Sequence, residues 1–166
     1  GALLDWVGHH VDIAHWVVGI DNSGPVEVKG KGLFPPKTDL WDAPTEYNCY
    51  AKYKDDMVIH INSDFPSGTK WIGEDGWIFV ARGGFGQEGG LKESSIEGIF
   101  DEDRSKFSKK LYKSDDHYQN FIDSIRSGKE SITPCETAHR SASVGHLCNI
   151  AMRNGRTINW NPETEE

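Results

Sequence analysis

Hydrophobic residues recur at helical spacing near both ends of the chain and alternate with polar residues between them. An apolar stripe predicts a mostly buried helix over residues 3–18, which Gly19 ends. The stripe consists of Leu4, Val7, Val11, Ala14 and Val18. Residues 118–125 predict a second helix, and a capping box that begins at Thr133 predicts a third helix ending at Gly155.

The middle of the chain predicts strands, because hydrophobic and polar residues alternate between turn-forming segments. The predicted strands cover residues 26–34, 47–53, 57–62, 69–72, 77–81, 95–100 and 158–160. Short loops between most of them favour antiparallel pairing. Since helices flank these strands, we predict one α+β domain over residues 1–166, in which an open, mainly antiparallel sheet has helices packed on one face.

Composition narrows the class of protein. With 166 residues, the chain is long enough for one domain with a core. It carries 26 acidic against 18 basic residues, for a formal net charge of −8, and no nucleic-acid motif, so we expect no nucleic-acid partner. No uncharged apolar run approaches about 18 residues, which argues against a membrane span. Three widely spaced cysteines, Cys49, Cys135 and Cys148, predict free thiols rather than a disulfide framework.

The chain starts at a predicted helix without an initiator methionine. We therefore expect a piece of a longer protein, and the cellular compartment stays undefined because a leader would lie upstream. The glycine-rich segment 83–90 lacks the spacing of a nucleotide-binding loop and predicts a surface loop instead.

The first predicted helix carries unusual chemistry for a buried element. Asp5, His9 and Asp12 fall on one strip about 60° wide, here called the Asp–His strip, whereas His10 and His15 lie off it. Asp5 and His9 are four residues apart and can pair, and an aspartate that orients an imidazole is a recurrent acid/base device. A structural Asp–His pair explains the same spacing. A metal site on these side chains lacks any supporting cysteine or HExxH pattern.

Three stretches, in order, resemble the C-terminal domain of the Gfo/Idh/MocA oxidoreductases. Residues 3–19 contain the family's D-x3-H-x2-D helix, and residues 70–82 contain its strand–turn–strand with a G-E-x-G-W core. Residues 117–166 contain H-x2-N-F-x3-I-x-S-G, then E-x2-H-R-S, and end with G-R-x-I-x-W-x-P-x-T-E. Together these stretches cover about half of the chain.

The resemblance implies half of a two-domain enzyme. In the family an N-terminal Rossmann domain binds NAD or NADP, and the active site lies between it and the α+β domain. The family's histidine is the acid/base at the substrate hydroxyl or carbonyl, a role that falls here on His9, with Asp5 as its partner. Asp12 matches a second aspartate whose role varies. This sequence has no strand–GxGxxG–helix, so the cofactor would be bound mainly by the missing domain.

The resemblance therefore predicts the substrate-binding and oligomerisation domain of an NAD(P)-dependent dehydrogenase acting on a sugar, polyol or related polyhydroxy compound. Trp41, Asp42 and Asp12 are candidate substrate contacts, although the loop 35–44 also fits an ordinary surface excursion. An NAD-dependent glycosidase of the same fold and a non-catalytic assembly domain are the alternatives. We expect a small carbohydrate-like substrate, a homo-oligomer formed through the sheet face, and an isolated chain that is inactive.

Overall fold

A computed structural model describes residues 1–83, 88–101, 103 and 111–166. In chain order its elements are α1 (Ala2–Val18), β1 (Glu27–Leu33), β2 (Glu46–Lys52), β3 (Val58–Asn62), β4 (Thr69–Gly73), β5 (Gly76–Ala81), β6 (Gly90–Ser94), α2 (His117–Ser127), α3 (Cys135–Asn154) and β7 (Ile158–Asn159). Helices at both ends flank a run of antiparallel strands, and the sheets are open. The predicted α+β class is therefore confirmed.

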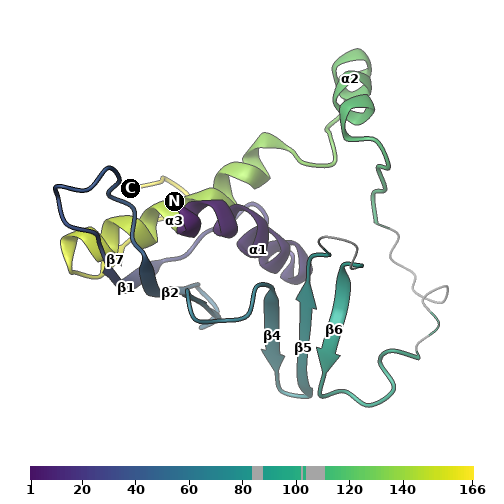
Figure 1. Cartoon of the computed structure of the whole chain (residues 1–166). Helices are drawn as coiled ribbons and strands as arrows, with labels where there is room; N and C mark the ends of the chain where they lie inside the picture. Colours follow the sequence, from purple (N-terminus) through teal and green to yellow (C-terminus); the bar gives the residue numbers. More distant parts are fainter. Residues whose placement is uncertain (84–87, 102, 104–110) are drawn as a thin grey trace.

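The described strands form two antiparallel sheets where the sequence predicted one. The four-stranded sheet has the order β3–β2–β1–β7, and the three-stranded sheet has the order β4–β5–β6. Between them the chain leaves β3 through a turn that contains Pro66, which has no N–H group to continue a ladder. Figure 1 shows α1 and α3 lying together over the four-stranded sheet, with the three-stranded sheet beside it.

The core lies between these two helices and one face of the four-stranded sheet, here called its inner face. Val28, Cys49 and Ala51 point to this face, and each is completely buried. Close approach of the helices depends on Gly145 of α3, where a Cβ would lie 2.9 Å from Leu4 Cδ2 and 3.1 Å from Val7 Cγ1. The buried cluster also contains Leu3, Val11, Tyr53, Val144, Leu147, Cys148, Ala151 and Met152.

Helix α2 stands apart from this core (Figure 1). The Asp116 carboxylate accepts a hydrogen bond from Gln119 N at 2.8 Å, which caps its start, and Gly128 in the left-handed region, at φ 67°, ends it. None of its residues is buried, and Tyr118 of its apolar face is 87% exposed. No described helix has the length and apolar character needed to cross a membrane.

Helix α1 is less buried than the sequence predicted. Its inward face holds Val7, Val11 and Ala14 of the predicted stripe, but Leu4 is 36% exposed and Val18 is 43% exposed. The buried positions at the ends of the stripe are Leu3 and His15 instead. The reason is that α1 packs chiefly on α3, which covers one side of it only.

Two local predictions are wrong. Helix α3 begins at Cys135 with Pro134 as its N-cap and no side-chain cap, because the backbone of Pro134 is extended, at ψ 149°, and the helix therefore starts one residue later than the predicted capping box requires. The predicted strand at 95–100 is a bend and turn, since the Ser94 hydroxyl accepts from Ile96 N and ends the ladder at β6. Of the predicted surface loop 83–90, residues 84–87 lie outside the described part of the chain.

Candidate functional site

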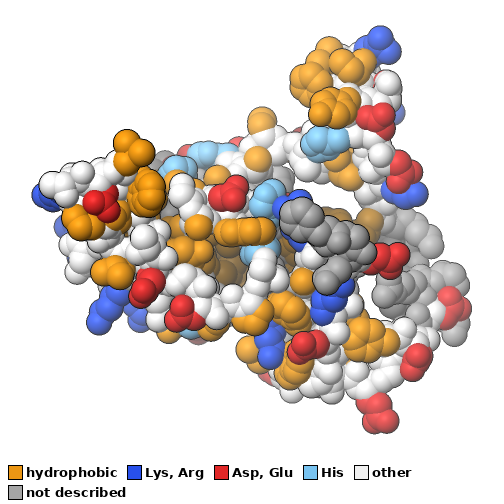
Figure 2. All heavy atoms as spheres, in the orientation of Figure 1, with side chains coloured by type: hydrophobic (Ala, Val, Ile, Leu, Met, Phe, Trp, Pro, Cys, Tyr) orange, Lys and Arg blue, Asp and Glu red, His pale blue; other side chains and the backbone are white. Residues whose placement is uncertain are grey.

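The Asp–His strip lies on the exposed side of α1. Because Leu3, Val7 and Val11 face the core, Asp5 and His9 project away from it, and both are exposed. Figure 2 shows histidine and hydrophobic side chains gathered at the surface over this helix. The fold therefore presents these two side chains where a substrate or a second domain can reach them.

The structure does not join Asp5 to His9. Both residues are fully described, and no hydrogen bond or ion pair links them within the described chain. His9 contacts its own helix instead, with its ring edge-to-face on Trp6 at a centroid distance of 6.2 Å and an interplanar angle of 65°. The strip thus holds the two side chains within one turn of each other without fixing their pairing.

Asp12 is the least exposed member of the strip. Burial and the nearby charge of Asp21 raise the pKa of its carboxyl, while the Ser141 hydroxyl and His9 act in the opposite direction. Ser141 belongs to α3 and is itself buried. Asp12 therefore faces the α1–α3 junction on one side and His9 on the other, which suits a residue that positions the histidine.

His10 forms a second polar feature beside the strip. Its ring stacks on Trp6 at 5.2 Å, and its carbonyl accepts a hydrogen bond from Thr69 Oγ1 at 3.1 Å, which ties α1 to β4. The Nε2 atom of His10 is buried with no partner in the described structure. Burial lowers the pKa of His10, and the charges of His9 and Arg82 lower it further. His10 is therefore held as a neutral ring near neutral pH.

His15 is a core residue. It is 1% exposed, and its Nε2 lies 2.6 Å from the hydroxyl of Tyr53, a residue that follows β2. Burial lowers the pKa of His15 and raises the pKa of Tyr53, so both groups are neutral in the folded chain near neutral pH. Sequence spacing placed His15 off the strip but gave no sign of this bond, because Tyr53 is 38 residues away.

The loop that carries Trp41 and Asp42 lies beside the start of α1. Gly1 packs so closely against Ala43 that it leaves no room for a side chain. Trp41 is 62% exposed. Asp42 is tied to the end of α3, because Arg153 Nη2 lies 3.1 Å from its Oδ2 and donates to its carbonyl at 2.8 Å. The fold brings this loop to the end of α1 that carries Asp5.

The described residues do not fit the phosphates of a dinucleotide. Such a site needs a glycine-rich turn from a strand into a helix with free N–H groups. The Asp116 carboxylate already occupies the start of α2, and α3 begins after Pro134 with the acidic Glu136 in its first turn. Among the residues that the structure describes, no group of three or more His, Cys, Asp or Glu side chains is placed to hold a metal ion.

Sequence reasoning missed the polar groups on the far side of the four-stranded sheet. A hollow of about 310 Å³ lies there, lined by side chains of β1, β2, β3 and the turn after β3. It contains none of the strip residues, so it is a separate feature from the α1 site. Strict alternation along β1 and β2 was the available signal, since Lys31 and Asn48 alternate with the inward-facing Gly30 and Cys49.

Solved structures share this fold at low sequence identity. One is an aldose-aldose oxidoreductase from Caulobacter crescentus, complexed with glycerol, with a TM-score of 0.56 and 14% identity over 90% of this chain. Another is the presumed oxidoreductase yvaA from Bacillus subtilis, with a TM-score of 0.53 and 13% identity over 93% of this chain.

The chain spans 44% of the Caulobacter protein and 50% of the Bacillus protein. No family model matches the sequence, and a comparison with curated proteins gives no match. The chain therefore has the fold of about half of a Gfo/Idh/MocA-type oxidoreductase, which is the fold that the motifs of its sequence predict.

Proposed function

We propose that this chain is the substrate-binding and oligomerisation domain of an NAD(P)-dependent oxidoreductase that acts on a sugar, polyol or related polyhydroxy compound. The fold shared with half of an aldose-aldose oxidoreductase supports the general reaction. The observation that carries the proposal is the exposure of Asp5 and His9 on α1, while His15 of the same helix is buried in a bond to Tyr53. Of these histidines, His9 is the one left available for chemistry.

In this proposal His9 exchanges a proton with the substrate oxygen. Removal of a hydroxyl proton must accompany oxidation of a carbinol, and an exposed imidazole is a side chain suited to that step. Asp5 lies one turn earlier on the same exposed face, where a change of rotamer brings its carboxylate to the ring. It would then orient the imidazole and stabilise its protonated form. Asp12, which lies between His9 and the α1–α3 junction, would help to position the His9 ring.

The cofactor would be bound by a second domain, because the described residues do not fit its phosphates. NAD or NADP would accept or supply the hydride, and this chain would supply the substrate pocket wall and the proton. Trp41 and Asp42 are proposed as substrate contacts because their loop borders the Asp5 end of α1. The glycerol bound to the Caulobacter protein is consistent with a small polyhydroxy substrate.

Assembly through a sheet face is part of the proposal. The outer face of the four-stranded sheet mixes charged side chains such as Lys29 and Lys31 with exposed apolar ones such as Leu33 and Val58, so it is not a continuous apolar surface. The three-stranded sheet is better suited, because every residue of β5 is only partly buried and Ile72 of β4 is 79% exposed. We therefore place self-association on the three-stranded sheet.

The test is a set of substitutions in the full-length protein. His9→Ala should lower kcat by roughly two to four orders of magnitude, the range expected for loss of general acid/base catalysis. Asp5→Asn should also lower kcat while leaving the melting temperature unchanged, because the fold does not use the Asp5 side chain.

The matched controls are His10→Ala and His15→Ala, which should act through stability alone. Normal turnover in His9→Ala, together with loss of turnover in a stable His10→Ala, would overturn the assignment. Product analysis separates the two reactions of this fold, since net reduced cofactor accumulates with a dehydrogenase but not with an NAD-dependent glycosidase.

A further inference from the structure

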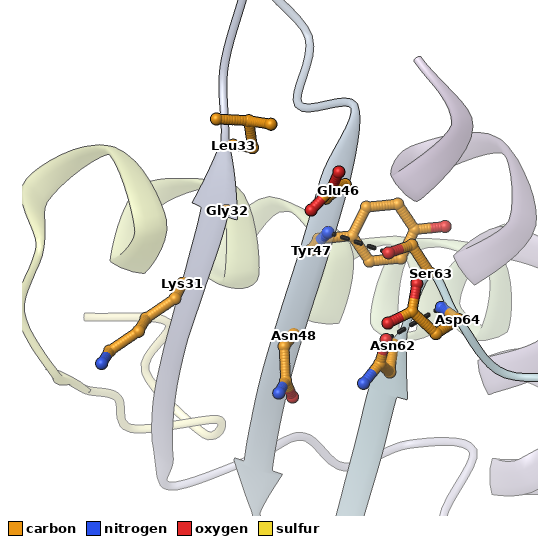
Figure 3. A pocket seen from close by; sticks show the side chains of 9 residues that line it. All are labelled: Lys31, Gly32, Leu33, Glu46, Tyr47, Asn48, Asn62, Ser63 and Asp64. Carbon is orange, nitrogen blue, oxygen red and sulfur yellow. Dashed lines mark hydrogen bonds between the residues drawn. The ribbon is translucent and has the colours of Figure 1, made fainter.

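The outer face of the four-stranded sheet, the face turned away from α3, is organised in rows of cross-strand partners. One row is Lys31, Asn48 and Asn62, which are register partners on β1, β2 and β3. The inward direction of their neighbours fixes this orientation, because a Cβ on Gly30 or Gly32 would meet the Met152 side chain of α3. Figure 3 shows the row at the hollow of about 310 Å³ that Glu46, Ser63 and Asp64 complete.

Two internal hydrogen bonds fix the amide groups of this row. His60 Nε2 donates to Asn48 Oδ1 at 2.7 Å, and Asp64 N donates to Asn62 Oδ1 at 2.9 Å. Since each amide oxygen is engaged, each NH2 group is left to donate elsewhere. Neither amide nitrogen has a partner within the described chain. The hollow therefore contains two oriented donors.

The aromatic row next to this one holds His60 in place. His60 stacks on Tyr50 at 4.1 Å with an interplanar angle of 15°, and Phe65 meets it edge-on at 4.7 Å. A histidine fixed on both sides cannot swing away from Asn48. Oriented polar groups lose less entropy when they bind a ligand. The contacts that hold His60 therefore favour ligand binding at Asn48.

Charges of both signs line the hollow without neutralising one another. Lys31 supplies an ammonium, and Glu46 and Asp64 supply carboxylates, yet no ion pair within the described chain joins Lys31 to either carboxylate. The hollow thus offers donors from Lys31, Asn48 and Asn62 beside acceptors from Glu46 and Asp64. An excess of one carboxylate disfavours an anion. Leu33 and Tyr47 also line the hollow, so part of its wall is apolar, as in ligand pockets that combine apolar contact with a few polar groups.

We propose that this hollow binds a neutral polyhydroxy compound of about one sugar ring. Each hydroxyl group both donates and accepts, so a ring of hydroxyls matches alternating donors and acceptors in a way that no singly charged ligand does. A volume of about 310 Å³ lies at the small end of ligand pockets. The site is separate from the Asp–His strip on α1, so it does not depend on the proposed reaction. It would hold a sugar or polyol on the opposite face of the sheet.

The experiment is an NMR titration of this chain with D-glucose, myo-inositol and glycerol, each alone. At least one of them should give saturable shifts at the side-chain NH2 groups of Asn48 and Asn62 and at the backbone amides of Ser63 and Asp64. Lys31→Met or Asn48→Leu should raise the apparent Kd by roughly tenfold, the effect of about one hydrogen bond. Lys29→Met is the matched control, because it removes an ammonium from the same strand and face but outside the hollow, and it should leave Kd within about twofold.

Three results would overturn the proposal. The first is the absence of saturable shifts at these groups with all three compounds. The second is tighter binding of inorganic phosphate than of any polyol, which would show a cationic site. The third is a set of shifts that follows protein concentration and ignores added polyol, which would show that a second copy of the chain covers this face. Unchanged melting temperatures of the variants establish that any loss of binding is local.

Discussion

The three histidines of α1 occupy three different environments. The position of each one around the helix axis determines whether its side chain is exposed, half-buried or buried. His9 is exposed on the outer strip, His10 is half-buried against Trp6, and His15 is enclosed in the core beside Tyr53. A buried imidazole that keeps one hydrogen bond is more favourable neutral than charged, since a charge there would be desolvated. The same residue type is therefore structural at position 15 and available at position 9.

This arrangement predicts a loss of stability in mild acid. Burial lowers the pKa of His15, so the unfolded chain, with an ordinary pKa of about 6.5, binds the proton more tightly than the folded chain does. The contribution of His15 is complete above the unfolded pKa and is lost as the pH falls below it. His10 and His60 shift in the same direction. The free energy of unfolding from urea titration should be lower at about pH 5.5 than at about pH 7.5.

A second measurement isolates His15 from the other groups. The NMR titration midpoint of its ring protons should fall below the ordinary value for histidine. Asp12 contributes with the opposite sign, because burial raises the pKa of its carboxyl and protonation of that group therefore favours the folded state. A free energy of unfolding that stays level or rises between neutral and mildly acidic pH would contradict this account.

At the scale of the elements, two glycines in helices have opposite effects on stability. Gly145 of α3 sits where α1 crosses, and any side chain there meets Leu4 and Val7. Gly8 of α1 has no atom within 4 Å of the place where a Cβ would stand. The first glycine lets the helices approach, and the second only loosens α1, since glycine in a helix interior is less favourable than alanine.

Substitution of the two glycines should therefore change stability in opposite directions. Gly145→Leu should lower the free energy of unfolding by about 1–3 kcal/mol through overpacking against Val7. Gly8→Ala should raise it by about 0.5–1 kcal/mol, because it adds helix propensity and meets no neighbour. Urea titration of both variants checks the pair, and a stabilised Gly145→Leu would show that the helices are not in close contact.

At the scale of the whole molecule, the chain leaves large apolar side chains uncovered. Tyr118 on α2 and Ile72 on β4 are 87% and 79% exposed, although both elements have regular geometry. Isolated helices and small sheets gain little stability without packing, so these surfaces are suited to contact with other chains or domains. The four-stranded sheet with α1 and α3 has, by contrast, its own buried core.

Self-association should depend on the three-stranded sheet. Sedimentation velocity should show a mass above that of the monomer that increases with concentration, because Ile72 and its neighbours gain from burial. Ile72→Lys should reduce the association. Leu40→Lys is the control, since Leu40 is 96% exposed on the loop before β2, away from that sheet. A chain that is monomeric at every concentration would remove the basis of the assembly proposal.

The chain by itself should not bind the nicotinamide cofactor. No described helix starts directly after a strand at a glycine-rich turn, which is the arrangement that holds a pyrophosphate. Asp116 and Glu136 moreover place carboxylates at the starts of α2 and α3. Calorimetric titration with NAD and with NADP should give no heat beyond dilution. Binding at micromolar concentration would mean that residues of this chain form a phosphate site, and the division of labour between two domains would be wrong.

Much of the local structure could be predicted from the sequence. The helical stripe through Val7, Val11 and Ala14, the strands on either side of residues 54–56, and the helix stops at Gly19, Gly128 and Gly155 all follow from period and turn chemistry. The fold class comes from the same periodicity. These features depend on residues close together in the chain, which is why the pattern alone indicates them. The exposure of His9 does not follow from it, because the periodicity predicted a mostly buried helix.

Tertiary structure decided everything that depends on distant residues meeting. The break into two sheets, the bond between His15 and Tyr53, and the row formed by Lys31, Asn48 and Asn62 all join segments that no local pattern relates. The pairing of Asp5 with His9, which the spacing allows, is not made among the described residues, where both side chains are exposed. Sequence period determines which side of an element is apolar, whereas packing determines which polar groups on the other side become a site.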